Sequence, residues 1–259
     1  MPAIDELRGL WRRTMYRRRW RRRERDVAVF WLQGPRLFAD LRQPPGRPDF
    51  ADVRCLRDLR DGHLDWMARQ HGFAGSLTVR GDIAEWHRAV DFQPGDGIAD
   101  RARIRLDGAT LREAGTEARY RETWVRDRPP AAPCWGVRLA DDETGRSAFL
   151  VRAGPDFMVA RGRSAPLHGG GGLARLMAAT PCLAARQDLV DCEISLGRVD
   201  RETGAWRIAR STLPYREGDA LTAVPAGATA IRIDDFDPEG ATVSRLWRIV
   251  DADGEGWRA

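Results

Sequence analysis

One spacing of about 120 residues recurs along the chain and relates its first half to its second. Glycine and proline mark turns that need particular backbone angles, and tryptophan marks the anchors of a core, so these residue types persist when a unit is copied. Four such features return in the same order, three after 120 residues and the last after 123: Gly34-Pro35 and Gly154-Pro155, Trp86 and Trp206, Pro94 and Pro214, and Trp124 and Trp247. The spacing therefore predicts two copies of one folding unit, over residues 1–130 and 131–259.

The local patterns indicate what the unit is. Both halves consist of short segments with partial period-2 alternation, moderately rich in β-branched and aromatic residues and bounded by Gly, Pro or Asp, as expected for strands. These segments are 27–33, 36–42, 75–80, 83–91, 101–106, 110–114 and 118–126 in the first half, and 134–139, 146–152, 156–161, 190–199, 204–211, 219–223, 228–233 and 241–250 in the second. One helical stretch lies within 51–70 and another at the corresponding place within 172–187. About seven or eight strands with one helix match a small closed antiparallel barrel, so we expect a mainly β chain of two tandem barrels.

The positive charge of the chain is concentrated at its N-terminus. The formal net charge is +5, residues 1–25 contribute ten arginines against three acidic residues, and the remainder is slightly acidic. Arginines interleaved with Trp11, Tyr16 and Trp20 could bind phosphates of nucleic acid or anionic lipid. However, subtracting 120 from the predicted 134–146 hairpin gives residues 14–26, which makes the arginine run the first strand and turn of the first barrel. We therefore expect nucleic-acid binding to be the less favoured alternative; Met15 is a second candidate start.

The composition excludes several function classes. The chain contains no lysine, which removes Schiff-base chemistry, a pyridoxal phosphate anchor and a Walker A lysine. Its four cysteines show no Cys-x-x-Cys spacing, its first residues lack an apolar signal region, and no stretch is long enough to span a bilayer. The four histidines show no metal-ligand spacing. We expect a cytoplasmic protein without metal or other cofactor.

Four segments resemble a known family. The segments WLQGPRLFADLRQP (31–44), GFAGSLTV (72–79), AEWHRAVDFQP (84–94) and LREAGTEARYRETW (111–124) resemble the Hri-type proteins of fungi and bacteria. The resemblance covers most of the first half and, more loosely, the Gly-Pro hairpin and tryptophan segments of the second. It implies that the two barrels are calycin-like, that is, lipocalin-like. It carries no catalytic signature.

Alternation along the strands suggests where a ligand could bind. In a barrel, every second residue of a strand faces the interior. If the tryptophans point inward, residues on the same strand faces join them, and the resembled segments add Asp40, Arg42 and Glu113. On the strand 84–92 this alternation puts Trp86, Arg88, Val90 and Phe92 on one face. The ligand-binding candidates are Trp31, Gln33, Arg42, Trp86, Arg88, Glu113, Tyr120, Glu122 and Trp124. The alternative is an interior filled by the tryptophans, with Arg88 and Glu122 as a buried ion pair.

These observations favour a non-enzymatic binding protein whose first barrel holds a small apolar or amphipathic ligand. A protein-interaction module with filled barrels, presenting an outer face to a partner, is the second hypothesis. A third is an enzyme that uses Glu113 or Glu122 as acid or base at a barrel mouth, which requires a raised carboxyl pKa.

Overall fold

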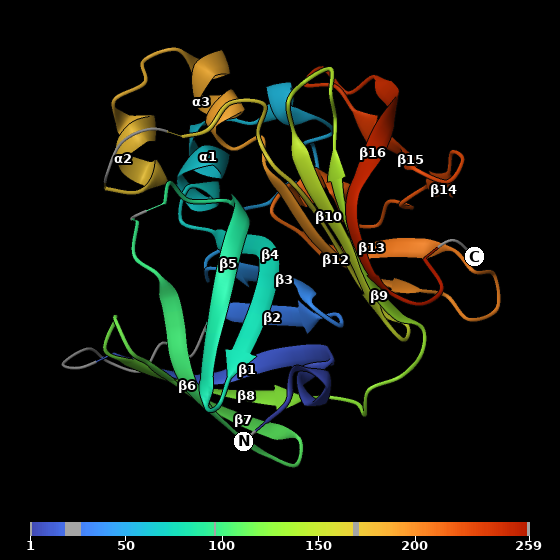
Figure 1. Ribbon diagram of the computed structural model, residues 1–259. Helices are drawn as coiled ribbons and strands as arrows, with labels where there is room; N and C mark the ends of the chain where they lie inside the picture. Colours follow the sequence, from blue (N-terminus) through green and yellow to red (C-terminus); the bar gives the residue numbers. More distant parts are fainter. Residues whose placement is uncertain (1, 19–26, 96, 168–170, 258–259) are drawn as a thin grey trace.

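The computed structural model describes residues 2–18, 27–95, 97–167 and 171–257 and confirms a mainly β chain with two eight-stranded antiparallel sheets (Figure 1). The first sheet contains β1 (Gly9–Arg18), β2 (Ala28–Gln33), β3 (Leu37–Gln43), β4 (His71–Arg80), β5 (Ile83–Asp91), β6 (Asp100–Asp107), β7 (Thr110–Gly115) and β8 (Tyr120–Arg126). The second contains β9 (Cys134–Ala140), β10 (Ser147–Ala153), β11 (Asp156–Arg161), β12 (Glu193–Val199), β13 (Trp206–Ser211), β14 (Ala223–Pro225), β15 (Ala230–Phe236) and β16 (Thr242–Gly254). Each predicted strand segment except 219–223 overlaps its observed strand by most of its length.

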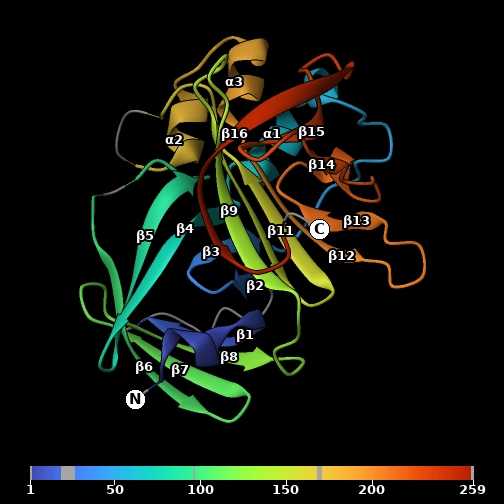
Figure 2. The same cartoon turned by 45° about the vertical axis from the view of Figure 1, so that its right-hand side comes forward.

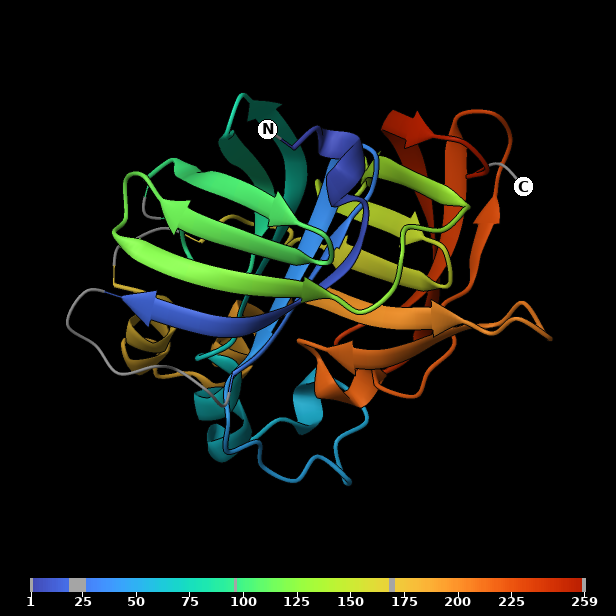
Figure 3. The same cartoon turned by 90° about the horizontal axis from the view of Figure 1, so that it is seen from below.

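The first sheet is a closed barrel. Its strands pair in chain order, and β1 closes the circle by pairing with both β2 and β8. In Figure 3, seen from below, β1 runs beside β8 across the front of this barrel. The arginine-rich segment 14–26, predicted as a first strand and turn, is therefore confirmed as part of the barrel wall over residues 14–18, and the strand itself begins earlier, at Gly9. Residues 19–26 of that prediction lie outside the described residues.

The second sheet is not closed by strand pairing alone. Its order is β13-β12-β11-β10-β9-β16-β15-β14, so that β13 and β14 are its edges. The segment before β14 lies against β13: Arg207 pairs with Ala220, and the Leu221 N–H donates to the Trp206 carbonyl at 2.8 Å. This irregular segment lies between β13 and β14, where the first barrel has the β5–β6 ladder.

The two halves have the same strand order once β9 is placed on β1. Trp86 and Trp206 then occupy the fifth strand of each half, and Trp124 and Trp247 occupy the eighth. Leu111 lies opposite Trp124, and Ile231 lies opposite Trp247, in corresponding ladders. The predicted duplication is thus confirmed in strand order.

The residue alignment near the Gly-Pro turns is wrong by one position. The β2–β3 connection has four residues between the paired Gln33 and Phe38, whereas only Gly154 and Pro155 separate Ala153 from Asp156. Because a shift of one residue reverses the face of a strand, Trp31 packs inside the first barrel while Val151 packs between the halves. The first strands are not offset by 120 either: Trp11, opposite Trp31, and Trp135, opposite Arg152, both face a barrel interior and lie 124 residues apart.

The helices gather at one end of the molecule, where the two halves meet (Figures 1 and 2). The first half contributes α1 (Asp61–Met67). The second contributes two helices rather than the single one predicted, α2 (Leu173–Ala178) and α3 (Leu183–Leu189). Pro181 lies between them and cannot continue a helix, because it lacks an N–H and its ring clashes with the preceding turn. No helix in the described part of the chain has the length and apolar character of a membrane span.

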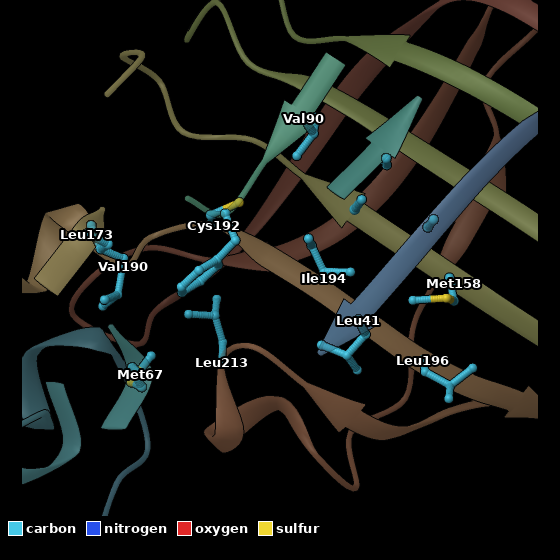
Figure 4. Packing of buried hydrophobic residues seen from close by; sticks show 14 of the residues in the cluster. Leu41, Met67, Val90, Met158, Leu173, Val190, Cys192, Ile194, Leu196 and Leu213 are labelled. Atoms are coloured by element: carbon cyan, nitrogen blue, oxygen red, sulfur yellow. The ribbon is translucent and has the colours of Figure 1, made fainter. Parts of the chain in front are cut away.

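Three clusters of buried apolar residues organise the core. One fills the first barrel, and one lines the inner face of the second sheet. The third lies between the halves and under the helices, where the outer faces of β2 and β3 pack on β10–β12 (Figure 4). Gly136 of β9 permits this approach, since a Cβ atom there would lie 2.9 Å from Leu37 Cβ. The two sheets therefore share an apolar interface as well as a chain.

Candidate ligand site inside the first barrel

Part of the interior of the first barrel is filled by tryptophans. Trp31 stacks on Trp11, with ring centroids 6.0 Å apart. Trp31 also meets Trp86 and Trp124 edge to face, each at 5.8 Å. All four indoles are buried, the most accessible being Trp86 at 7%. Such edge-to-face contacts hold aromatic rings in fixed orientations, so the tryptophans form a rigid floor.

Two carboxyl groups lie side by side above this floor. Glu113 and Glu122 are directly opposite each other across the β7–β8 ladder, and both are buried. Glu113 accepts hydrogen bonds from the Tyr120 hydroxyl (2.6 Å) and from Trp124 Nε1 (2.9 Å). Glu122 accepts one from Arg13 Nη1 at 2.6 Å. The two carboxyl groups therefore have different partners: neutral donors for Glu113 and a guanidinium for Glu122.

Burial and the nearby negative charge change how these groups ionise. Burial, together with the charge of Glu122, raises the pKa of Glu113 to about 8, although the Tyr120 hydrogen bond opposes the rise. Burial also raises the pKa of Glu122, against the opposing charges of Arg42 and Arg13. The pKa of Tyr120 is raised by burial and by Glu113. These shifts favour one proton on the Glu113–Glu122 pair at neutral pH.

The remaining polar groups come from β3, β5 and β6. Arg42 donates to Asp40 at 2.6 Å, two residues earlier on the same face of β3. Arg88 pairs with Asp91 at 3.1 Å and with Asp100 at 2.5 Å, and its guanidinium lies 3.6 Å from the Phe73 ring centroid. Arg88 is more than one third exposed and Glu122 is buried, so Arg88 marks the outer end of the site.

These side chains enclose a cavity of about 120 Å³. For comparison, a cavity of roughly 150 Å³ in a protein core accepts benzene. The lining combines aromatic and ionisable residues; it consists of Tyr16, Trp31, Asp40, Arg42, Phe73, Trp86, Arg88, Asp100, Glu113, Tyr120, Glu122 and Trp124. The barrel is therefore filled at its floor and hollow above it.

Eight of the nine sequence-predicted site residues lie in this lining, and Gln33 does not. Gln33 is fully buried at the end of β2, where its amide donates to the Gly34 carbonyl at 3.0 Å. It stabilises the β2–β3 connection rather than contributing to the site.

Two further expectations are corrected. Arg88 does not pair with Glu122 but with Asp91 and Asp100. In addition, the predicted common face of Trp86, Arg88, Val90 and Phe92 is broken by a bulge. Ala74 pairs with Val90 and Gly75 with Arg88, so Ala89 is an extra residue. The bulge reverses the alternation, and Val90 and Phe92 turn out of the barrel into the core between the halves.

Sequence reasoning did not select Arg13, Tyr16, Phe73 or Asp100, and it named Asp40 only through the family resemblance. Thr14 is an extra residue in β1, since Arg13 pairs with Trp124 and Met15 with Thr123. This bulge lets both Arg13 and Tyr16 contribute to the interior, which a strict alternation forbids. Asp100 could have been found only from its place at the start of β6, opposite Trp86.

The corresponding end of the second half has a different character. Arg161 pairs there with Asp191 at 3.0 Å and Asp235 at 3.2 Å, and Asp191 pairs with Arg146 at 2.6 Å. Arg161 and Arg146 lower the pKa of Asp191 to about 2, against the effect of burial. The space left among these side chains is about 20 Å³, room for about one water molecule. This end is sealed by ion pairs.

The described residues contain no group of three His, Cys, Asp or Glu side chains placed to hold a metal ion. His87 contacts Thr78 and Glu85 and does not line the cavity.

Comparisons with known proteins bear on the fold alone. No family model matches the chain, and no curated protein matches it. A solved structure, that of the uncharacterized protein YLR301w from Saccharomyces cerevisiae, is similar at 9% sequence identity with a TM-score of 0.53. The alignment covers 95% of this chain and 99% of that one. The paired-sheet architecture thus occurs over the full length of a second protein.

Proposed function

We propose that the chain is a binding protein of the Hri type whose first barrel holds a small amphipathic molecule above its tryptophan floor. One observation carries the proposal: a cavity of about 120 Å³ that is lined by both aromatic and ionisable side chains. Ligand sites combine apolar walls with a few placed polar groups in this way. The family assignment is supported by the segments on β2–β3, β4, β5 and β7–β8 that carry the resemblance.

The cavity supports a ligand more polar than the sequence suggested. Half of the residues that line it are ionisable acids or arginines, namely Asp40, Arg42, Arg88, Asp100, Glu113 and Glu122. A purely apolar molecule would leave those groups without the hydrogen bonds that water gives them. An amphipathic molecule of benzene size or smaller matches both the volume of the cavity and its mixture of aromatic and ionisable side chains.

Tryptophan fluorescence tests this proposal. Because Trp31, Trp86 and Trp124 line the cavity, a bound molecule changes their emission, and the change saturates with concentration. The variant Trp86→Phe is expected to weaken binding about tenfold, by loss of ring contact. Trp206→Phe, at the equivalent place in the second half, serves as the matched control and leaves binding unchanged. Linear, non-saturating titrations across a panel of small polar and amphipathic molecules would refute the proposal.

The enzyme hypothesis receives one supporting observation, since the pKa of Glu113 is raised to about 8. Binding is nevertheless the better-supported function, because both oxygens of Glu113 are held by Tyr120 and Trp124. A general acid needs its proton directed at a reacting atom.

A further inference from the structure

The cavity of the first barrel contains one carboxyl group without an arginine partner. Three of the four carboxyl groups that line it are in ion pairs: Asp40 with Arg42, Asp100 with Arg88, and Glu122 with Arg13. Glu113 forms no ion pair with any arginine of the described residues, and its side chain is buried, with 6% of its surface exposed. Three arginines thus face four acidic groups, and the interior has one excess negative charge that protonation of a carboxyl group reduces.

The second half shows what the same end of the fold looks like when charge is balanced. Four acidic residues gather at that end, and each has an arginine nitrogen within 4 Å: Asp141 with Arg245, Asp191 with Arg146, Glu193 with Arg216 and Asp235 with Arg161. Four arginines there meet four carboxylates, and the space among them has room for about one water molecule. Against this internal reference, the first half lacks one positive charge and has an unfilled volume.

The walls of the cavity suit a positively charged group. Tryptophan rings attract a cation to their faces, with about 0.5–2 kcal/mol of interaction depending on desolvation. Trp31 and Trp86 line the cavity, and Trp124 both lines it and donates to Glu113. An ammonium group beside Glu113 would therefore contact a carboxylate and aromatic rings together.

A second polar group of the site has no partner. The indole N–H of Trp31 is buried and donates to no atom of the described residues, whereas the indole N–H of Trp124 is satisfied by Glu113. A buried donor without an acceptor costs about 1–3 kcal/mol. An oxygen atom on the ligand would supply that acceptor.

We propose that the ligand of the first barrel is a small protonated amine that also has an oxygen acceptor, with its ammonium group bound at Glu113. The inference rests on the proposed function, because it names the chemical class of the molecule that occupies the same cavity. The amine replaces the arginine that Glu113 lacks, and the volume limits the molecule to about the size of benzene.

Binding of such a cation is linked to a proton. Glu113 must ionise to hold an ammonium group, and the groups that face it are Glu122, Tyr120 and Trp124 on β8, Asp100 on β6 and Arg42 on β3. Because the pKa of Glu113 is about 8 in the free protein, uptake of the amine releases a proton below that pH. The apparent affinity should rise about tenfold per pH unit between pH 6 and 8 and then level off.

Calorimetric titration of the full chain with three molecules of matched size tests the proposal: 2-aminoethanol, ethylene glycol and glycolate. We expect only 2-aminoethanol to bind with the stated pH dependence and with proton release, measured in buffers of different ionisation enthalpy. Glu113→Gln should weaken its binding at least tenfold at pH 8. The matched control is Glu85→Gln, which removes a carboxylate of β5 that pairs with Arg101 of β6. This variant should bind as the wild type does.

The outcomes separate this inference from the proposed function. Binding of ethylene glycol or glycolate in the cavity, with no preference for 2-aminoethanol, overturns the amine assignment and leaves a small-molecule site. Amine binding that is independent of pH and of Glu113 also overturns it. Failure of all three molecules, together with failure of the fluorescence titrations above, overturns both proposals. The pH series uses the wild-type chain, so the test stands even if Glu113→Gln does not fold.

Discussion

Gly75 and Gly197 occupy the same position in the two halves of the molecule. Each lies in the fourth strand of its half, opposite a bulge in the fifth strand formed by Ala89 or Ala209. A Cβ atom on Gly75 would overlap the His87 carbonyl oxygen, and one on Gly197 would overlap the carbonyl oxygen of Arg207. The bulge and its glycine are therefore a feature of the repeated unit rather than of either half.

Gly75→Ala should destabilise the protein by about 2 kcal/mol or more, because a methyl group cannot be placed without moving the β5 backbone. Urea denaturation of the variant measures the loss. Gly62→Ala in α1 is the control: a Cβ atom there meets no other atom within 4 Å, so its effect should be neutral or slightly stabilising. Equal stability of the two variants would contradict the overlap.

Asp191→Asn should cost about 3–5 kcal/mol, because it leaves Arg161 and Arg146 buried with one partner fewer. The exposed Asp188, paired with Arg57 on the surface, provides the control: Asp188→Asn should cost less than 1 kcal/mol. The pKa of Asp191 is lowered to about 2, so its stabilisation is present above the unfolded pKa near 4 and is lost as pH falls through 2. Acid unfolding followed by circular dichroism should show this loss in the wild type and not in Asp191→Asn.

Glu113 should give the opposite dependence on pH. Its pKa is raised to about 8 in the folded protein, so the folded state binds a proton that the unfolded state has released. Its contribution is fully present below about pH 4.5 and declines as pH rises to 8, by at most about 1.4 kcal/mol per pH unit. The measurement is the free energy of unfolding of the ligand-free protein at pH 5, 6, 7 and 8, compared with that of Glu113→Gln. If the difference between wild type and variant is the same at every pH, the raised pKa is refuted.

Tyr120→Phe should move the ionisation of Glu113 to higher pH. The Tyr120 hydroxyl donates to Glu113 Oε1 and thereby stabilises the carboxylate, so its removal raises the pKa of Glu113 further. Carbon-detected NMR of the labelled glutamate carboxyl groups reports the midpoint. Tyr215→Phe, beside the ion pairs of the second half, is the control and should leave that midpoint in place. A midpoint that falls in Tyr120→Phe would show that the hydrogen bond does not favour the carboxylate.

The strand order and most of the candidate site followed from the sequence because turn residues and tryptophans mark them. Gly34-Pro35 and Gly154-Pro155 do lie at equivalent turns, and alternation correctly grouped Tyr120, Glu122 and Trp124. What failed has a common physical origin. Bulges and loop lengths change which face of a strand a residue occupies, and nothing in a local pattern announces one extra residue.

Charge pairing was harder still to predict. Alternation placed Arg88 and Glu122 inside one barrel, but their heights along its axis depend on strand tilt and register. Arg13, the actual partner of Glu122, is 109 residues away from it in the chain. The two residues are neighbours in the fold because β1 pairs with β8.

The apolar face shared by the two sheets affects which residues of the two halves can be substituted during evolution. Leu32, Leu37 and Leu41 on one side and Phe149 and Val151 on the other are covered only because the halves remain joined. A barrel released on its own would present that face to water and aggregate. The second half thus stabilises the first through this interface. Residues that line the cavity of the first barrel can therefore be substituted over time while the fold is retained.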